Sequence, residues 1–240
     1  MAVFDISSAG LHILAMLFML LDHLWATVVS GNEWMTCVGR LAFPIFAFLL
    51  VEGFFHTRSR KKYALRLFLF ALITEIPFNL MVGGRIFYPI HQNVLWTFLI
   101  SFGLMVWNER IKEAAPWRRL LRFALSFMAG LLVGLLTMVD YYGYGVAMVL
   151  IFYLFRGKTW WDRLGQLLGL YWINVEMMGG LVYEFEALGR LWVIHQQGFA
   201  VLALVFIWLY RGRKGHSSKA FQYFCYAFYP VHMLILGLLR

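Results

Sequence analysis

Ionisable side chains recur inside long apolar stretches of this chain, where they could carry proton-transfer chemistry. Asp22 and His23 are adjacent within an apolar run that covers residues 8–29. An unperturbed imidazole titrates near pH ~6.5, and a neighbouring carboxylate orients the ring and stabilises its protonated form. The pair therefore predicts a general base that removes a proton from an amine or hydroxyl, with His23 as the base and Asp22 as its partner.

Other ionisable residues fall at similar depths in neighbouring apolar runs. Counted from the outer end of each run at about 1.5 Å per residue, they lie roughly 8–11 Å below the outer boundary. This agreement predicts one polar layer, to which Asp22 and His23 also belong, with the further members Glu75, Glu176, His195 and His232. We expect Glu75 and His232 to take part in catalysis and Glu176 and His195 to contact substrate. Taken singly, each would fit a structural bond to a neighbouring helix equally well.

The tripeptide His91-Gln92-Asn93 opens another apolar run just above this layer. His91 is the second candidate for the base. With Gln92 and Asn93 it is also a candidate donor to a developing oxyanion or to the acceptor. No serine or cysteine stands in the sharp turn that a nucleophile requires. The histidine spacing does not define a zinc site, so we expect no metal.

The stretch Gly39–Tyr63, GRLAFPIFAFLLVEGFFHTRSRKKY, carries charges at both ends and one carboxylate inside. Glu52 lies roughly 20 Å below Gly39. We expect Glu52 and Arg40 to contact substrate along a polar path across the membrane. The residues at the end of the stretch are candidates for binding the phosphates of a nucleotide-like donor: His56, Arg58, Arg60, Lys61 and Lys62. For each single cation, a topology signal is the competing explanation.

The elements that position these residues are predicted to be membrane-spanning helices. Hydrophobic residues make up 62% of the chain and charged residues 14%, against about 45–50% and about 25% in soluble domains; mean hydropathy is +0.72. A span needs about 20 mostly apolar residues. This rule places helices near 8–29, 38–56, 63–82, 91–107, 119–139, 143–155, 164–183, 190–210 and 220–239. We expect an all-α, polytopic transmembrane bundle of about nine spans (between about eight and ten), forming a single domain over residues 1–240.

The distribution of cations orients this bundle. The net charge is +9, which in a soluble chain would suggest a nucleic-acid partner. Here most of the 21 Lys and Arg residues lie in the loops that follow the second, fourth, sixth and eighth apolar runs. This bias places the N-terminus and those loops in the cytoplasm. We therefore expect the lipid bilayer of a cell inner or plasma membrane, and no nucleic acid, as partner.

Several segments together resemble the TraX family. They are DH at 22–23, the stretch at 39–63, TEIPFN at 74–79 and HQNVLWT at 91–97. The resemblance is strong over the first hundred residues and continues by helix pattern beyond them. It implies a protein of the bacterial inner membrane, associated with conjugation and with N-acetylation of pilin subunits. More loosely, the chain is similar to multi-pass membrane acyltransferases whose last helix carries a Tyr…His pattern, here Tyr229-Pro230-Val231-His232.

The resemblance and the polar layer together predict a membrane-embedded acyltransferase. It would use acetyl-CoA as cosubstrate and transfer acetyl to an amine or hydroxyl, on a pilin-like protein N-terminus or on a glycan. The alternative is a proton-coupled transporter or channel, because ladders of buried carboxylates and histidines also mark proton paths. Against this alternative, the chain shows no repeated pair of short, broken helices in two halves.

Overall fold

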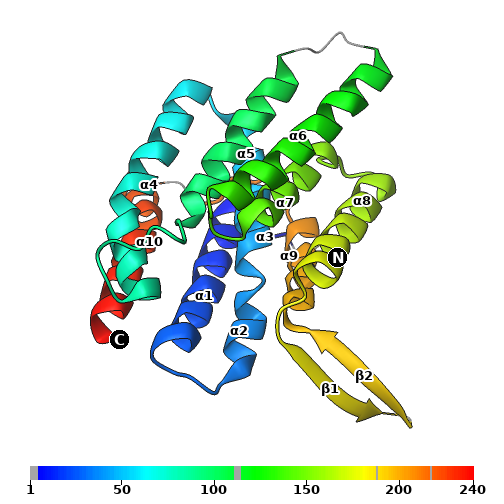
Figure 1. Cartoon of the computed structure of the whole chain (residues 1–240). Helices are drawn as coiled ribbons and strands as arrows, with labels where there is room; N and C mark the ends of the chain where they lie inside the picture. The colour runs from blue at the N-terminus through cyan, green and yellow to red at the C-terminus, as the bar shows by residue number, and fades with distance from the viewer. Residues whose placement is uncertain (1–4, 111–114, 188, 217) are drawn as a thin grey trace.

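The computed structural model describes residues 5–110, 115–187, 189–216 and 218–240 as a helical bundle with a small hairpin at one end (Figure 1). The described part of the chain holds ten α-helices: α1 (Ser8–Thr27), α2 (Glu33–Gly39), α3 (Ala42–His56), α4 (Arg60–Gly83), α5 (Val94–Glu109), α6 (Pro116–Leu136), α7 (Tyr142–Leu154), α8 (Trp160–Tyr171), α9 (Ala203–Trp208) and α10 (Lys219–Leu239). A π-helix, η1 (Trp172–Met178), continues α8, and a 3-10 helix, η2 (Gln196–Leu202), leads into α9. The expected all-α bundle is confirmed, apart from the hairpin.

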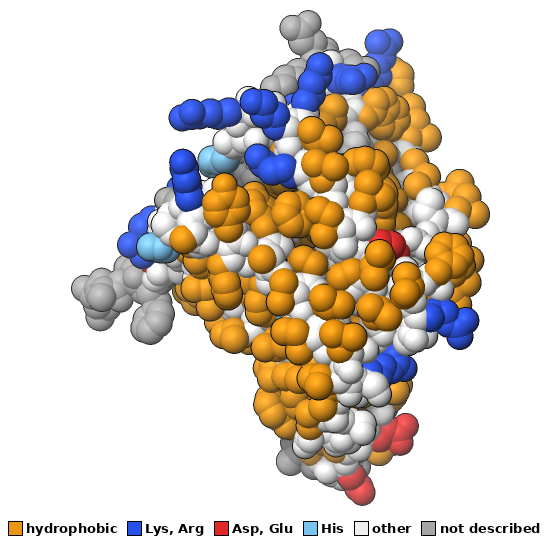
Figure 2. Space-filling model, turned by 90° about the vertical axis from the view of Figure 1, so that its left-hand side faces the viewer, with side chains coloured by type: hydrophobic (Ala, Val, Ile, Leu, Met, Phe, Trp, Pro, Cys, Tyr) orange, Lys and Arg blue, Asp and Glu red, His pale blue; other side chains and the backbone are white. Residues whose placement is uncertain are grey.

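Several of these helices have the length and composition to cross a membrane. The segments that meet both criteria among the described residues are Ser8–Thr27, Glu33–His56, Arg60–Gly83, Pro116–Leu136 and Lys219–Leu239. Shorter apolar segments are Val94–Glu109, Tyr142–Leu154 and Gln196–Trp208. Figure 2 shows hydrophobic side chains over the middle of the molecule and many Lys and Arg side chains gathered at its upper end. This is the surface of a multi-pass membrane protein, while the count of about nine spans stays a prediction.

Helix α3 is the central element of the bundle. Ten of its 15 residues are buried, and it packs against α1, α5, α7 and α9. A helix that is apolar on all sides is expected to be enclosed by other helices. Pro44 is the third residue of α3, where the missing backbone donor costs least. Helix α3, within the stretch at 39–63, therefore forms the core around which the other helices are arranged.

The helix expected over residues 38–56 is broken at Arg40 and Leu41, between α2 and α3. Helix α2 packs so closely on α1 that a Cβ atom at Gly39 would lie 2.4 Å from the Cβ atom of Asp22. Only glycine allows this approach. The break places Arg40 beside α1, with its guanidinium bonded to the Asp22 carboxylate.

The helix expected over residues 164–183 ends earlier, at Met178. Gly179 and Gly180 follow it with positive φ angles of 64° and 80°, which break the helical backbone and which glycine adopts without strain. The last residues of the expected helix belong instead to the first strand of the hairpin, β1 (Val182–Ala187).

The helix expected over residues 190–210 is also wrong in its first turn and a half. Residues Arg190–His195 form strand β2, which pairs antiparallel with β1 in a register that places Val182 opposite His195. The run Trp192-Val193-Ile194 is rich in residues that favour strands, and Gly189, with φ of 68°, lies in the turn. The segment is apolar as predicted, but its backbone is a strand and not a helix.

Candidate active site

A cavity of about 340 Å³ lies near the end of the bundle opposite the basic loops. It is lined by residues of α1, the α2–α3 break, α3, α4, α5, η1, η2 and α10 and of the segment between α6 and α7. Its polar lining residues are Asp22, His23, Arg40, His91, Asp140, Tyr141, Tyr142, Gln197 and Tyr229. We call this space the His23 cavity. It gathers residues from both ends of the sequence.

His23 is bonded to His232 of the last helix. The His23 Nδ1 and His232 Nε2 atoms are 2.7 Å apart, and the ring planes differ by only 5°. His232 Nδ1 lies 2.7 Å from the Phe228 carbonyl oxygen, which can only accept a hydrogen bond. His232 therefore carries its proton on Nδ1 and accepts at Nε2 from the N–H of His23. In the neutral pair this leaves Nε2 of His23 unprotonated, as a general base requires.

Asp22 does not orient His23, contrary to expectation. Its carboxylate is bonded to the Arg40 guanidinium and accepts a hydrogen bond from Thr36 Oγ1 at 2.7 Å. Thr36 in turn accepts from the side-chain amide of Gln196 at 2.9 Å. The side chains of two adjacent helical residues leave the helix about 100° apart, so Asp22 faces α2 while His23 faces α10. The partner that fixes the His23 ring is therefore His232.

His91 forms a second histidine–carboxylate pair, with Asp140. The His91 Nε2 and Asp140 Oδ1 atoms are 3.2 Å apart. The backbone brings them together, because Gln92 N donates to the Met138 carbonyl at 2.9 Å and Asp140 N donates to the Gln92 carbonyl at 2.8 Å. The hydrogen bond with Asp140 raises the pKa of His91 above its usual 6.5, against the opposing effect of burial.

The loop that carries Asp140 has an unusual backbone. Met138, Tyr141 and Tyr142 all have positive φ, of 50°, 58° and 47°. Such conformations are uncommon for residues other than glycine and are concentrated at functional sites. Burial also raises the pKa of Tyr141 above its usual value, so its phenol remains protonated. The strained loop thus presents a carboxylate and a neutral phenol to the His23 cavity.

Glu75 does not line the His23 cavity. Its Oε2 atom accepts from the Asn93 side-chain amide at 2.5 Å and from Trp96 Nε1 at 3.1 Å. Asn93 also donates to the Ala71 carbonyl and caps α5 through its Oδ1 atom. Glu75 therefore positions the start of α5 rather than touching a substrate.

Two of the three expected oxyanion donors are already occupied. The Asn93 amide is used by Glu75 and Ala71, and the Gln92 amide donates to the Pro89 carbonyl at 2.9 Å. Neither residue lines the His23 cavity. Of the expected donors only His91 does, and Arg40 lines the same space as a cation.

Glu176 and His195 are outside the His23 cavity. Glu176 lies in η1 with an exposed side chain, so it is not part of the polar layer. His195 ends β2, and its Nδ1 atom is buried without a hydrogen-bond partner. The depth count failed for both because it assumed helices over segments that form a π-helix and a hairpin.

Glu52 faces a different space, a hollow of about 470 Å³ at the basic end of the bundle. Its Oε1 atom is 2.9 Å from Arg156 Nε. We call this space the Glu52 hollow.

The cations expected to bind a donor's phosphates line neither the Glu52 hollow nor the other cavities of the described residues: His56, Arg58, Arg60, Lys61 and Lys62. The polar path expected through Glu52 to Asp22 is absent here, because the α3 residues between them are mostly buried and apolar.

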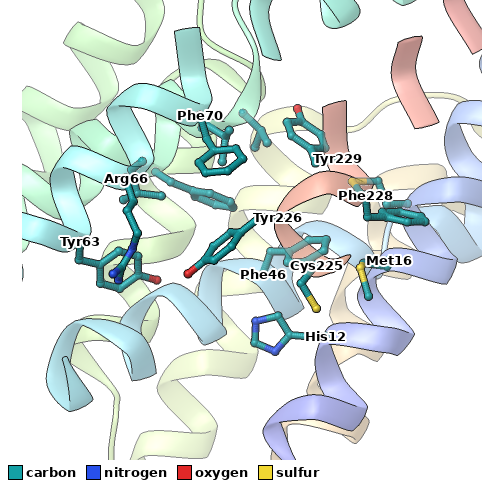
Figure 3. A pocket seen from close by; sticks show the side chains of 15 residues that line it. His12, Met16, Phe46, Tyr63, Arg66, Phe70, Cys225, Tyr226, Phe228 and Tyr229 are labelled. Carbon is teal, nitrogen blue, oxygen red and sulfur yellow. The ribbon is translucent and has the colours of Figure 1, made fainter. Parts of the chain in front are cut away.

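An apolar slot adjoins the His23 cavity instead (Figure 3). The slot has a volume of about 140 Å³ and shares with the cavity the lining residues Met19, Phe46, Val94, Phe98 and Tyr229. Figure 3 shows aromatic side chains of α4 and α10, among them Phe70 and Tyr226, pointing into it. Arg66 and His12 also line it.

A small recess of about 150 Å³ adjoins the slot in turn. It shares His12, Cys225 and Tyr226 with the slot, and Lys214 and His216 add positive or titratable charge. We call it the α1–α10 recess. Recess, slot and cavity therefore follow one another from the basic end of the bundle to His23.

Sequence reasoning missed several residues of the site. Asp140 and Tyr141 stood out only as part of a polar group between two apolar runs, Thr36 carried no distinguishing signal, and Tyr229 entered only through the Tyr…His pattern of the last helix. Their roles depend on contacts between helices far apart in the chain. Among the described residues, no three His, Cys, Asp or Glu side chains converge as a metal site.

The fold and the site together define a multi-pass helical membrane protein with a histidine- and carboxylate-lined cavity near one end of its bundle. The family model described as TraX protein matches residues 7–240. The chain belongs to the TraX family, which confirms the resemblance of its early segments.

One relative extends this assignment. A protein of Dichelobacter nodosus described as "Probable fimbrial assembly protein FimC, serogroup H1" is 30% identical over an alignment that covers 97% of this chain and 95% of that protein. No solved structure matches the chain significantly.

Proposed function

We propose that this protein is an acyltransferase that moves an acetyl group from acetyl-CoA to an amine or hydroxyl acceptor. One observation carries the proposal. His23 is held at Nδ1 by His232, makes no hydrogen bond at Nε2 to any described residue, and lines a cavity that adjoins an apolar slot. This arrangement suits a general base at a site where the thioester arrives through the slot and the acceptor arrives through the cavity.

The chemistry follows from the neutral His23–His232 pair. His23 Nε2 takes the proton of the acceptor as its nitrogen or oxygen attacks the thioester carbonyl. The C–S bond then breaks, and the imidazolium returns the proton to the departing thiolate of CoA. His232 stabilises the His23 imidazolium by accepting a hydrogen bond from its Nδ1–H. Arg40 and His91 line the same cavity and are the candidates to stabilise the oxyanion that forms on the carbonyl oxygen.

The donor is proposed to enter through the α1–α10 recess and the slot. The apolar slot suits the thin pantetheine arm, while Arg66, Lys214 and His216 lie where the phosphates of CoA would remain. Cations pair well with phosphate oxygens. This route replaces the cations of the α3–α4 loop as the proposed phosphate contacts.

The bundle is proposed to cross the bacterial inner membrane about nine times, with its N-terminus and basic end in the cytoplasm. In this orientation acetyl-CoA arrives from the compartment that contains it, and the His23 cavity lies near the outer face. The acceptor then reaches the cavity from outside or from within the membrane. Because one relative is described as a probable fimbrial assembly protein, a pilin-like protein is the first acceptor to test and a glycan the second.

The test is acetyl transfer by membranes that contain the protein, together with CoA binding by the purified protein. His23→Ala should abolish transfer while leaving expression unchanged. His56→Ala is the matched control, because its side chain is exposed at the far end of α3. Full activity of the His23→Ala variant would remove His23 from the mechanism. Absence of CoA binding, together with substrate flux in liposomes, would instead favour the transporter alternative.

The donor route has its own test. Val94 lines both the slot and the His23 cavity, so Val94→Trp should narrow the junction and lower transfer strongly. Val133→Trp adds the same bulk on the exposed face of α6, where Val133 is 39% exposed, and should leave transfer unchanged. Equal transfer by the two variants would show that the donor does not pass this junction.

A further inference from the structure

We propose that the Glu52 hollow is a second binding site, separate from the His23 cavity, that takes the phosphate group of an anionic ligand. Four cations line it: Arg156, Lys158, Arg163 and Arg211. Among the described residues that line it, Glu52 is the single carboxylate. The hollow is larger than the His23 cavity, at about 470 against about 340 Å³.

The positive charge in this hollow is mostly uncompensated. Arg156 pairs with Glu52, with Nε and Oε1 2.9 Å apart. Lys158, Arg163 and Arg211 form no ion pair with any described residue. Like charges gathered around one space repel each other unless an anion joins them. A phosphate group offers several acceptor oxygens to such a cluster, and arginine binds it with two parallel hydrogen bonds.

The walls of the hollow are held in place without a ligand. The Arg156 guanidinium lies over the Phe55 ring at 4.2 Å, and that of Arg163 lies 5.7 Å from the Trp208 ring centre. Trp208 Nε1 donates to Gln166 Oε1 at 2.7 Å, and the Gln166 amide donates to the Phe155 carbonyl at 2.6 Å. A site whose side chains are already fixed loses little conformational entropy when it binds.

The hollow is not a part of the donor route. Phe46 of α3 lines the slot and the His23 cavity, whereas Phe48 and Glu52 line the hollow. Residues 46 and 48 point about 200° apart on a helix, so α3 separates the two spaces. The lining residues of the hollow are shared with neither the slot nor the cavity. A ligand here would bind whether or not the protein transfers acetyl groups.

The phosphate can belong to a lipid or to a soluble molecule. Basic pockets between membrane helices on the cytoplasmic side bind anionic lipid headgroups, and this hollow lies at the end of the bundle where the basic loops gather. A soluble phosphate would use the same cations. A lipid phosphate binds only when anionic lipid is present, whereas a soluble phosphate also binds to protein held in a bilayer without anionic lipid.

The experiment uses the whole purified protein and one matched control. The test variant combines Lys158→Gln, Arg163→Gln and Arg211→Gln. The control combines Arg58→Gln, Lys61→Gln and Lys62→Gln, which removes the same charge from exposed positions at the same end of the bundle but outside the hollow. Because both variants lose three charges, non-specific attraction of anions falls equally in both.

Two measurements separate the sources. Native mass spectrometry in detergent detects retained phosphatidylglycerol, and calorimetry in phosphatidylcholine nanodiscs measures binding of inorganic phosphate. We expect the test variant to bind one of these ligands roughly tenfold or more weakly than the control variant does. Loss of lipid retention alone assigns the site to a headgroup, and loss of the soluble ligand alone assigns it to a free phosphate compound. Equal binding by the two variants, or no binding by the unmodified protein, would overturn the proposal.

Discussion

His23 and His232 are 209 residues apart in the chain, yet their ring nitrogens lie 2.7 Å apart. The bond joins the first helix to the last. It also fixes where the protons of both rings lie, because the carbonyl of Phe228 can only accept from His232. The His23 ring is thus oriented by a residue at the other end of the sequence and not by its immediate neighbour Asp22.

Replacing His232 should lower acetyl transfer without abolishing it. Loss of a general base costs about 10²- to 10⁴-fold, and we expect His232→Ala to cost less than His23→Ala. His232→Gln should recover part of the rate, because the amide oxygen can accept the same proton from His23. The initial rate of acetyl transfer by membranes that contain each variant, measured as a function of pH, tests this recovery. If His232→Gln and His232→Ala are equally impaired at all pH values, the proposed hydrogen bond does not set the rate.

Removing one partner of the Asp22–Arg40 pair should destabilise the fold. The two side chains are 17% and 15% exposed, and breaking a buried pair leaves one charge uncompensated, at a cost of about 3–5 kcal/mol at full burial. We expect Asp22→Asn and Arg40→Gln each to lower the Tm of the purified protein.

The double variant is the control for this prediction. With both charges removed, it should be more stable than the sum of the two single effects implies. Strict additivity in thermal unfolding would show that the pair makes no net contribution.

The His91–Asp140 pair should make stability depend on pH. Asp140 raises the pKa of His91 above 6.5 in the folded state, so the folded protein binds this proton more tightly than the unfolded chain does. The stabilisation is therefore fully present below about pH 6.5 and is lost as the pH rises through the folded-state pKa.

Thermal unfolding between about pH 5 and pH 8 measures this dependence. Asp140→Asn removes the negative partner, and its Tm should fall less over that range than the Tm of the unmodified protein. A parallel decline in both proteins would mean that other groups cause it.

Two helical glycines should respond oppositely to alanine. A Cβ atom at Gly143 would lie 2.3 Å from the carbonyl oxygen of Leu131, so α6 and α7 would have to separate. At Gly103 a Cβ atom meets nothing within 4 Å. Gly143→Ala should therefore destabilise the protein by about 1–3 kcal/mol, whereas Gly103→Ala should stabilise it by up to about 1 kcal/mol. Tm values in detergent that change in the same direction would contradict the close α6–α7 contact.

Apolar run length was sufficient to predict most helices of this bundle. The errors lie where local signals compete with hydropathy. Gly179 and Gly180 end a helix that hydropathy alone would continue, and Trp192-Val193-Ile194 form a strand although they are apolar enough for a span. Gly39 allows α2 to approach α1, and the break that follows it was hidden within one continuous apolar run.

Composition and apolar run length alone predict that the chain is a helical membrane protein and which polar residues lie within its apolar runs. The rise per residue gives the depth of a side chain along its own helix. It does not give the neighbour that the side chain faces, because that depends on how helices distant in sequence pack together. The contacts of His23 with His232 and of Asp22 with Arg40, and the position of Glu52 at a separate basic hollow, follow from this packing.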